Sequence, residues 1–342
     1  MPSNQKLGLQ TNVGVGADAL PARLALIREA EDLGYTSLWI AEVSGPDAFV
    51  SLAALAVNTR KAELATGVIP IQIRTPGAMA MGFLTINELS GGRAIAGLGV
   101  SSPIIVERWH GASYRKPVTA MRECVTIMRQ LLTEGRSKFQ GEVYKSDFKL
   151  SMRITAPRPP KIYLAGLNAP MLRLAGEVAD GVLMNYSPPG AIAPMVQHIG
   201  EGAKAAGRDP SAIDVGIYIR MCITEEEDKA VDSFRRELAG YAFVDTTTRC
   251  SRATDSRPSS TRYAGCGRKA SATRLPEPSR KRHAARSRYS GTPNPAAISS
   301  RDSAPPVLRI QWSFRSDRLP PRRAIIPTQC ARWPELERYL PL

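Results

Sequence analysis

The chain has 342 residues, enough for one large α/β domain or two ordinary ones, and its net charge of +15 would ordinarily indicate nucleic acid or an anionic membrane surface as partner. Residues 246–342, however, hold 18 arginines and 2 lysines against 6 acidic residues, a net charge of +14, which leaves +1 for residues 1–245. The long N-terminal part is therefore nearly neutral, and we expect neither nucleic acid nor a membrane as its partner.

Strands and helices alternate from residue 6 to about residue 241. Short apolar runs, each followed by a segment of helical length, predict seven strand–helix units. The predicted strands are 6–10, 37–40 (continuing toward Glu42), 64–69, 93–98, 162–165, 181–184 and 215–221. The predicted helices are 21–33, 46–58, 77–89, 116–132, 169–178, 191–206 and 225–241. Residues 135–160 interrupt this rhythm, and the stretch 138–144 predicts a small hairpin.

Consecutive buried strands with helices between them predict a parallel sheet with the helices outside. Seven units over this length favour a (β/α)8 TIM-type barrel over the alternative, an open doubly wound sheet. The chain changes character where the eighth unit is due. We therefore expect residues 1–245 to form an α/β barrel with a hairpin insertion at about 135–160, but without a normal eighth βα unit.

The C-terminal segment, residues 246–342, is rich in Arg, Ser and Pro, and proline is excluded from helix interiors and central strands. The nearest candidates for regular structure, 307–314 and 333–340, are short, so the composition predicts a basic tail of low order. It could be a nucleic-acid-binding arm, a disordered extension with another role, or out-of-frame translation of a GC-rich gene. The abrupt change at residues 246–248 favours the last origin.

Cysteine and histidine usage gives no sign of a structural metal or disulfide framework. The five cysteines include no CxxC spacing, and the three histidines lie far apart in the sequence. The N-terminus lacks the apolar segment of a signal peptide, and no apolar run is long enough to cross a membrane. We therefore expect a cytoplasmic protein without a metal site.

In a barrel of this type, chemistry lies at the carboxyl ends of the strands. Glu42 follows the second strand, where it could hydrogen-bond a cofactor ring or hold a proton, or else pair with a nearby arginine. Gly67 lies near the end of the third strand and permits the close approach of a flat ligand, although a simple turn would need the same residue.

The next strand ends carry polar loops. Gly99-Val100-Ser101-Ser102 offers amides and hydroxyls that suit an anion or a polar cofactor tail, but it lacks the third glycine of a dinucleotide fingerprint. Gly166-Leu167-Asn168 opens a helix, which suits either a phosphate or ordinary capping. Asn185 follows the sixth strand and can reach the same end of the barrel, its mouth. His110 is either catalytic or structural.

Several blocks, taken in order, resemble the luciferase-like monooxygenases, especially the branch that uses the deazaflavin coenzyme F420. The blocks are 33–42 (LGYTSLWIAE), 64–68 (LATGV), 89–93 (LSGGR), 97–99 (GLG), 106–111 (VERWHG), 159–166 (PPKIYLAG) and 175–181 (AGEVADG). The C-terminal segment that normally ends the family's barrel is not found here.

The resemblance implies a barrel that forms homodimers and binds F420, or alternatively FMN, at its mouth, with a hydride passing to or from the ring. It implies a non-proline cis peptide at Gly67-Val68, beneath that ring, and contacts from the loops after the fourth and fifth strands to the cofactor's tail and phosphate. We accordingly predict Glu42 and His110 as catalytic residues. The predicted cofactor-binding residues are Glu42, Gly67, Val68, Gly99, Val100, Ser101, Ser102, Gly166, Leu167, Asn168 and Asn185.

Four functions are compatible with the sequence. The leading one is an F420-dependent oxidoreductase that acts on a small organic substrate. The others are an FMN-dependent monooxygenase of the same superfamily, a defective chain without catalysis, and a nucleic-acid-binding protein that uses its basic tail.

Overall fold

The computed structural model of the chain describes residues 6–13, 19–222, 226–242 and 308–315. It divides into two units, one formed by residues 1–223 together with 307–342 and the other by residues 224–306.

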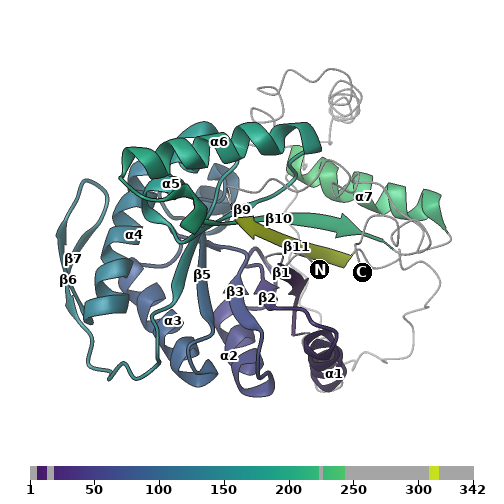
Figure 1. The fold of residues 1–342 in the computed structure, drawn as a ribbon, viewed down its shortest axis with the longest axis horizontal. Helices are drawn as coiled ribbons and strands as arrows, with labels where there is room; N and C mark the ends of the chain where they lie inside the picture. The colour runs from purple at the N-terminus through teal and green to yellow at the C-terminus, as the bar shows by residue number, and fades with distance from the viewer. Residues whose placement is uncertain (1–5, 14–18, 223–225, 243–307, 316–342) are drawn as a thin grey trace, which may run out of the picture. The chain divides into compact units, whose positions relative to one another are not determined.

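The first unit is built on one curved sheet (Figure 1). Its strands are β1 (Lys6–Thr11), β2 (Ser37–Ile40), β3 (Glu63–Thr66), β4 (Ile69–Pro70), β5 (Ala94–Gly99), β8 (Lys161–Ala165), β9 (Gly181–Met184), β10 (Asp214–Met221) and β11 (Leu308–Arg315). They are ordered β3-β2-β1-β11-β10-β9-β8-β5-β4, and β3 pairs with β5 as well. These pairings join eight strands in a ring, as a TIM-type barrel requires.

Six helices lie on the outer side of this sheet (Figure 1). They are α1 (Ala19–Asp32), α2 (Ala48–Asn58), α3 (Pro76–Ser90), α4 (Pro117–Glu134), α5 (Ala169–Val178) and α6 (Pro189–Ala205). Local sequence sets their ends: Thr75 caps α3 by accepting a hydrogen bond from the Ala78 amide, and Gly91 ends it in the left-handed conformation. The predicted hairpin is present as β6 (Arg136–Gln140) and β7 (Lys145–Lys149).

Apolar side chains form two layers. The larger cluster fills the space between the sheet and the helices. A smaller one fills the inside of the barrel and takes a single side chain from each of β2, β3, β5, β8, β9 and β10: Trp39, Ala65, Ile95, Tyr163, Leu183 and Tyr218. Inward side chains from six strands thus meet inside the barrel, which makes its interior a packed core.

The eighth place in the ring is occupied by β11. This strand lies between β1 and β10 and pairs antiparallel with both, so that Gln311 stands opposite Gly8 on one side and Tyr218 on the other. All other pairs of this sheet are parallel. Within residues 246–342, where the composition predicts little regular structure, the described part is therefore a strand that continues the sheet, in place of a normal parallel βα unit.

The observed helices and the strands of the large sheet that were predicted agree with the prediction to within about three residues, with four differences, and the hairpin extends to Lys149, beyond the predicted 138–144. The predicted strand 64–69 is divided into β3 and β4 by a cis peptide at Gly67-Val68, and β2 ends at Ile40 before reaching Glu42. A π-helix, η1 (Ile104–Trp109), and a short 3-10 helix, η2 (Pro210–Ala212), were not predicted. The described part of the second unit is α7 (Glu227–Ala242), preceded by Glu226, which pairs with Lys229 at 2.7 Å.

Candidate functional site

The carboxyl ends of β3 and β5 come together through glycines. The Gly67-Val68 peptide is cis, as the resemblance implies. A Cβ atom at Gly67 would lie 1.8 Å from the hydroxyl oxygen of Tyr218, and one at Gly99 would lie 2.4 Å from Cγ2 of Val68. Both positions therefore need glycine because of close approach, and three of the predicted site residues, Gly67, Val68 and Gly99, meet at one place.

Val68 covers the aromatic interior of the barrel at this end. Its half-buried side chain packs on the inner cluster. Within that cluster, the ring centroid of Trp39 lies 5.8 Å from that of Tyr163 and 6.3 Å from that of Tyr218. Buried side chains beneath Val68 give this end of the barrel a firm apolar floor.

Glu42 lies in a dense polar cluster at the end of β2. Its two carboxylate oxygens accept hydrogen bonds from the Nε and Nη2 atoms of Arg74, each at 3.0 Å, and the Ala48 amide donates to Oε2 at 2.9 Å. Arg74 also pairs with Asp47, and the hydrogen bonding that it donates to Glu42 is the main cause that raises the pKa of the arginine. The arrangement matches the structural alternative considered for Glu42, and its catalytic role stays a prediction.

The loop after β5 leads directly into η1. Ser101 adopts a left-handed backbone conformation, with φ of 55°, and Ser102 is buried with its hydroxyl accepting a hydrogen bond from the Ile105 amide at 3.4 Å. His110 ends η1 with an exposed side chain. Among the described residues, no hydrogen bond or ion pair joins His110 to Glu42.

The loop after β8 begins α5 in the ordinary way. The side chain of Asn168 accepts a hydrogen bond from the Met171 amide at 3.2 Å, and Pro170 in the first turn has no amide hydrogen to donate. Much of the anion-binding capacity of this helix start is therefore already used. A phosphate contact at Gly166, Leu167 and Asn168 stays a prediction.

A buried arginine lies at the carboxyl ends of β9 and β10. Arg220 is 5% exposed, donates a hydrogen bond to the side-chain oxygen of Asn185 at 3.0 Å and stacks over the ring of Tyr186 at 3.5 Å. Asn185 thus lies directly after the carboxyl end of β9, and its contact with a cofactor stays a prediction. Sequence reasoning missed Arg220, although an arginine near the end of an otherwise apolar strand is a signal that could have identified it.

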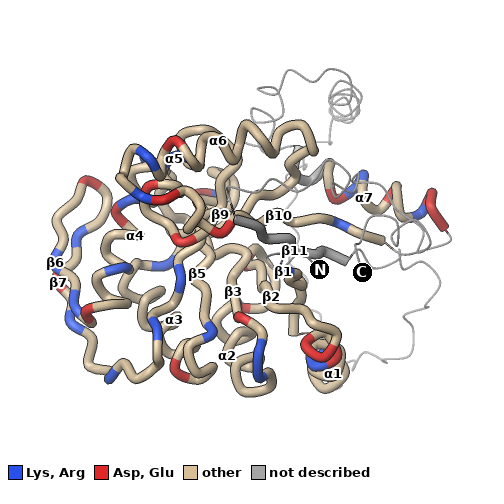
Figure 2. Tube along the Cα trace, viewed as in Figure 1, with Lys and Arg blue, Asp and Glu red and all other residues tan. Residues whose placement is uncertain are grey.

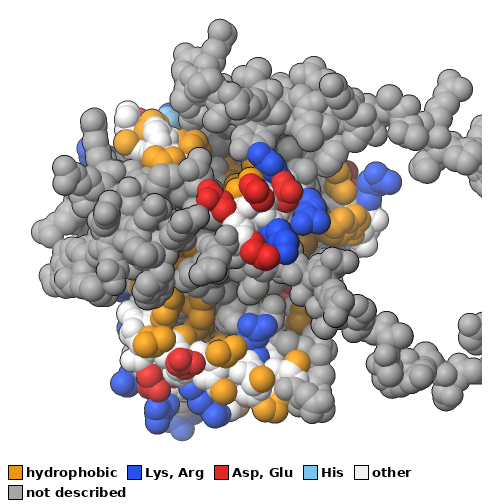
Figure 3. Space-filling view, turned by 90° about the vertical axis from the view of Figure 1, so that its right-hand side faces the viewer, with side chains coloured by type: hydrophobic (Ala, Val, Ile, Leu, Met, Phe, Trp, Pro, Cys, Tyr) orange, Lys and Arg blue, Asp and Glu red, His pale blue; other side chains and the backbone are white. Residues whose placement is uncertain are grey.

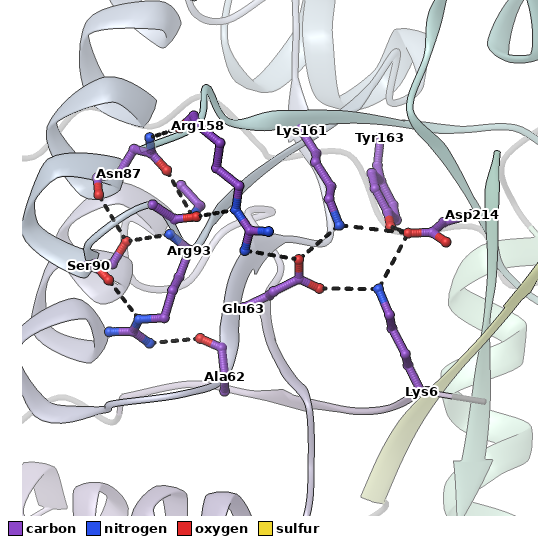
Figure 4. Close-up of polar contacts among 12 residues, drawn as sticks. Lys6, Ala62, Glu63, Asn87, Ser90, Arg93, Arg158, Lys161, Tyr163 and Asp214 are labelled. Atoms are coloured by element: carbon purple, nitrogen blue, oxygen red, sulfur yellow. Dashed lines mark hydrogen bonds and ion pairs between the residues drawn. The ribbon is translucent and has the colours of Figure 1, made fainter. Parts of the chain in front are cut away.

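The opposite end of the barrel carries a charged network (Figure 4). Lys161 pairs with Glu63 at 2.9 Å, while Lys6 lies 3.7 Å from Glu63 and 3.6 Å from Asp214. Tyr163 donates a hydrogen bond to Asp214, and burial, followed by the charge of Asp214, raises the pKa of the phenol. These groups satisfy one another across β1, β3, β8 and β10, which is typical of the stabilising end of a barrel.

Charges of both signs are interspersed over the described chain (Figure 2). Arg129 pairs with Asp180 at 2.8 Å, and Arg173 pairs with Glu201 at 2.9 Å. The face shown in Figure 3 likewise mixes apolar and charged side chains on its lower part, where α1 lies in Figure 1. In the ranges that the structure describes, no cluster of His, Cys, Asp and Glu could hold a metal ion. Nor is any helix in those ranges long and apolar enough to span a membrane.

Comparisons with known proteins agree with this architecture. The chain is 36% identical over 216 residues to a 5,10-methylenetetrahydromethanopterin reductase of Archaeoglobus fulgidus, covering 62% of this chain and 64% of the relative. It is 30% identical over 251 residues to an F420-dependent glucose-6-phosphate dehydrogenase of Kineococcus radiotolerans, covering 67% and 72%. The chain thus spans slightly less than two thirds of the length of the first of these curated relatives.

A solved structure and a family model extend the comparison. The structure of the coenzyme F420 dependent tetrahydromethanopterin reductase from Methanopyrus kandleri superposes with a TM-score of 0.60 and 29% identity, covering 70% of this chain and 72% of that one. The family model for luciferase-like monooxygenases matches residues 3–298, most of the chain. The chain belongs to the luciferase-like monooxygenase family.

Proposed function

We propose that the chain is an F420-dependent oxidoreductase that transfers a hydride between the deazaflavin and a small organic substrate. The observation that carries this proposal is the close approach of the ends of β3 and β5 at Gly67 and Gly99, above the inner apolar cluster. The chain is also 30% identical to an enzyme named for F420 dependence. Such a floor suits a flat ring whose own chemistry does the redox work.

The residues of the mouth fit such a ring. Gly67 and Gly99 let Tyr218 and Val68 lie against the backbone where a Cβ atom would collide with them, and Val68 presents an apolar surface backed by the inner cluster. The loops at Gly99, Val100, Ser101, Ser102 and at Gly166, Leu167, Asn168 would hold the polar tail. When bound, F420 supplies the carbon that accepts or donates the hydride, and the chain's part is to orient the ring and exclude water.

Two predicted residues would act on protons. Glu42 is fixed by three hydrogen bonds and would orient groups at the end of β2. The exposed imidazole of His110 would be the group that moves a proton. Asn185, held by Arg220, would contact the cofactor from the far side of the mouth.

Binding of F420 by the purified full chain tests the proposal. We expect saturable binding of F420, measured as quenching of the cofactor's fluorescence. Binding of FMN should be much weaker. Gly99→Ala should weaken F420 binding at least about tenfold, or about 1.4 kcal/mol, because its Cβ displaces Val68. Gly45→Ala is the matched control, since a Cβ there meets nothing within 4 Å.

The other outcomes of this titration select the alternatives. Binding of FMN without F420 would favour an FMN-dependent monooxygenase. A chain that unfolds cooperatively yet binds neither would be a defective, non-catalytic member of the family.

A homodimer is the partner arrangement that the family resemblance implies. Large apolar side chains on neighbouring helices support it: Val50 and Val57 on α2 are 70% and 66% exposed, and Met81 and Leu89 on α3 are 44% and 48% exposed. Apolar side chains grouped on one surface favour burial against a second copy. Sedimentation velocity of the full chain measures this directly.

A further inference from the structure

Gln72 lies just beyond β4, at the same end of the barrel as the cis peptide. The Ile71 amide donates a hydrogen bond to the Gly99 carbonyl at 3.0 Å, which continues the register of β4 beside β5. Ile69 and Ile71 pack in the outer cluster between sheet and helices. Gln72 follows in the turn directly after β4, next to the strand ends that carry Pro70 and Gly99.

The backbone around Gln72 is held on both sides. The hydroxyl of Tyr144 donates to the Ile71 carbonyl at 3.0 Å, and Arg74 is fixed by its two hydrogen bonds to Glu42. The glutamine therefore lies in a segment whose hydrogen bonds join this end of the barrel to the hairpin insertion and to the end of β2.

The side-chain amide of Gln72 is unusual in the described part of the chain. Both its nitrogen and its oxygen are buried, and neither has a hydrogen-bond partner there. Asn87 shows the normal case, because its nitrogen donates to the Arg158 carbonyl at 2.8 Å and its oxygen accepts from the Ala94 amide at 3.2 Å. A buried amide without partners costs stability, so native proteins hold few of them, and each calls for an explanation.

We propose that the Gln72 amide binds the imide edge of the redox cofactor. A primary amide offers an acceptor and a donor side by side, which is the complement of the adjacent N–H and carbonyl groups of a pyrimidinedione ring. F420 and FMN both carry that ring. The assignment rests on the proposed function and adds to it a specificity-determining residue, one that pairs with the ring's edge rather than with its face.

The test compares wild type with Gln72→Leu in two measurements on the full chain. Without cofactor, the melting temperature of the variant should equal or exceed that of wild type, because an unpartnered buried amide has been removed. The dissociation constant for F420 should rise at least tenfold. Gln130→Leu is the matched control: its oxygen accepts a hydrogen bond from Ser137 at 2.9 Å, so that variant should melt lower and bind F420 like wild type.

A modified ligand identifies the atoms involved. Wild type should lose at least tenfold in affinity for a deazaflavin methylated at the imide nitrogen, relative to the unmodified one, whereas Gln72→Leu should bind the two about equally. Full F420 affinity in Gln72→Leu would overturn the assignment while leaving the proposed function standing. A lowered melting temperature of the free variant would overturn it too, since the amide would then have a partner in the free protein. Failure of wild type to bind either F420 or FMN would remove the proposed function and this inference together.

Discussion

At the amino ends of the strands, a single charged side chain can hold several loops by forming hydrogen bonds with their backbone groups. Arg93 donates hydrogen bonds of 2.7 to 3.1 Å to the carbonyl oxygens of Ala56, Thr59, Ala62 and Ser90 and to the hydroxyl of Thr59. Figure 4 shows part of this arrangement beside the charged network. Burial lowers the pKa of this arginine. A guanidinium suits such a site because its five donors are fixed in one plane.

Replacing Arg93 with lysine should lower the free energy of unfolding by about 2 kcal/mol. The lysine side chain is shorter and ends in a single ammonium group, so some of these buried carbonyl oxygens would lose their hydrogen bonds. Urea unfolding of the purified chain measures the difference. Arg23→Lys is the control, since Arg23 is exposed on α1 and makes no hydrogen bond within the described ranges. A loss no larger than that of the control would contradict the prediction.

One buried carboxylate anchors the turn of the hairpin insertion to the outer layer of the barrel. The buried carboxylate of Glu123, on α4, accepts hydrogen bonds of 2.7 to 2.9 Å from the amides of Glu142, Val143 and Tyr144, in the turn between β6 and β7. Three amide groups around one carboxylate form an anion-binding turn. The insertion is thereby joined to the barrel's outer layer, and through Tyr144 to Ile71 near the candidate site.

Glu123→Gln should detach this turn, because the new amide nitrogen would face backbone N–H groups that need an acceptor. We expect a loss of about 2–3 kcal/mol in unfolding free energy. Hydrogen exchange at residues 142–144 should become faster, while exchange in β5 and β8 is unchanged. Glu134→Gln, an exposed change at the end of the same helix, is the comparison; equal exchange in the two variants would show that the carboxylate does not anchor the hairpin.

At the scale of the whole molecule, closure of the sheet depends on β11. This strand has neighbours on both sides, whereas β1 and β10 would each have an open edge without it. Unpaired edges and the apolar surface beside them destabilise a barrel and favour aggregation. The out-of-frame origin inferred for residues 246–342 stays a prediction, and the coding DNA around residue 246 tests it; the family match itself continues to residue 298.

Two truncated chains test the role of β11. A chain ending at residue 300 should lose the cooperative thermal transition of the first unit, because the ladders to β1 and β10 are gone. A chain ending at residue 318 keeps Leu308–Arg315 and should melt within a few degrees of the full chain. Similar melting of both truncated chains would mean that the sheet does not need β11.

The sequence by itself determined the local order of the molecule. The positions of α5 and β9 were predicted to the residue, because periodic apolar patterns and strong end signals such as Asn168 at a helix start act over a few residues. Ordered family blocks likewise indicated the cis peptide at Gly67-Val68 and the end of the barrel that holds the candidate site. The alternation of Leu308, Ile310, Trp312 and Phe314 is also typical of a strand, but it is short and lies in a segment whose composition predicts little regular structure.

Only the tertiary structure decided which distant groups meet. Pairing of Glu42 with Arg74, stacking of Arg220 on Tyr186 and burial of the Gln72 amide depend on how strands far apart in sequence are placed side by side. The antiparallel insertion of β11 between β1 and β10 has the same cause. A strand's pattern of side chains is the same in either direction, so its orientation and partners are set by the edges left open in the folded sheet.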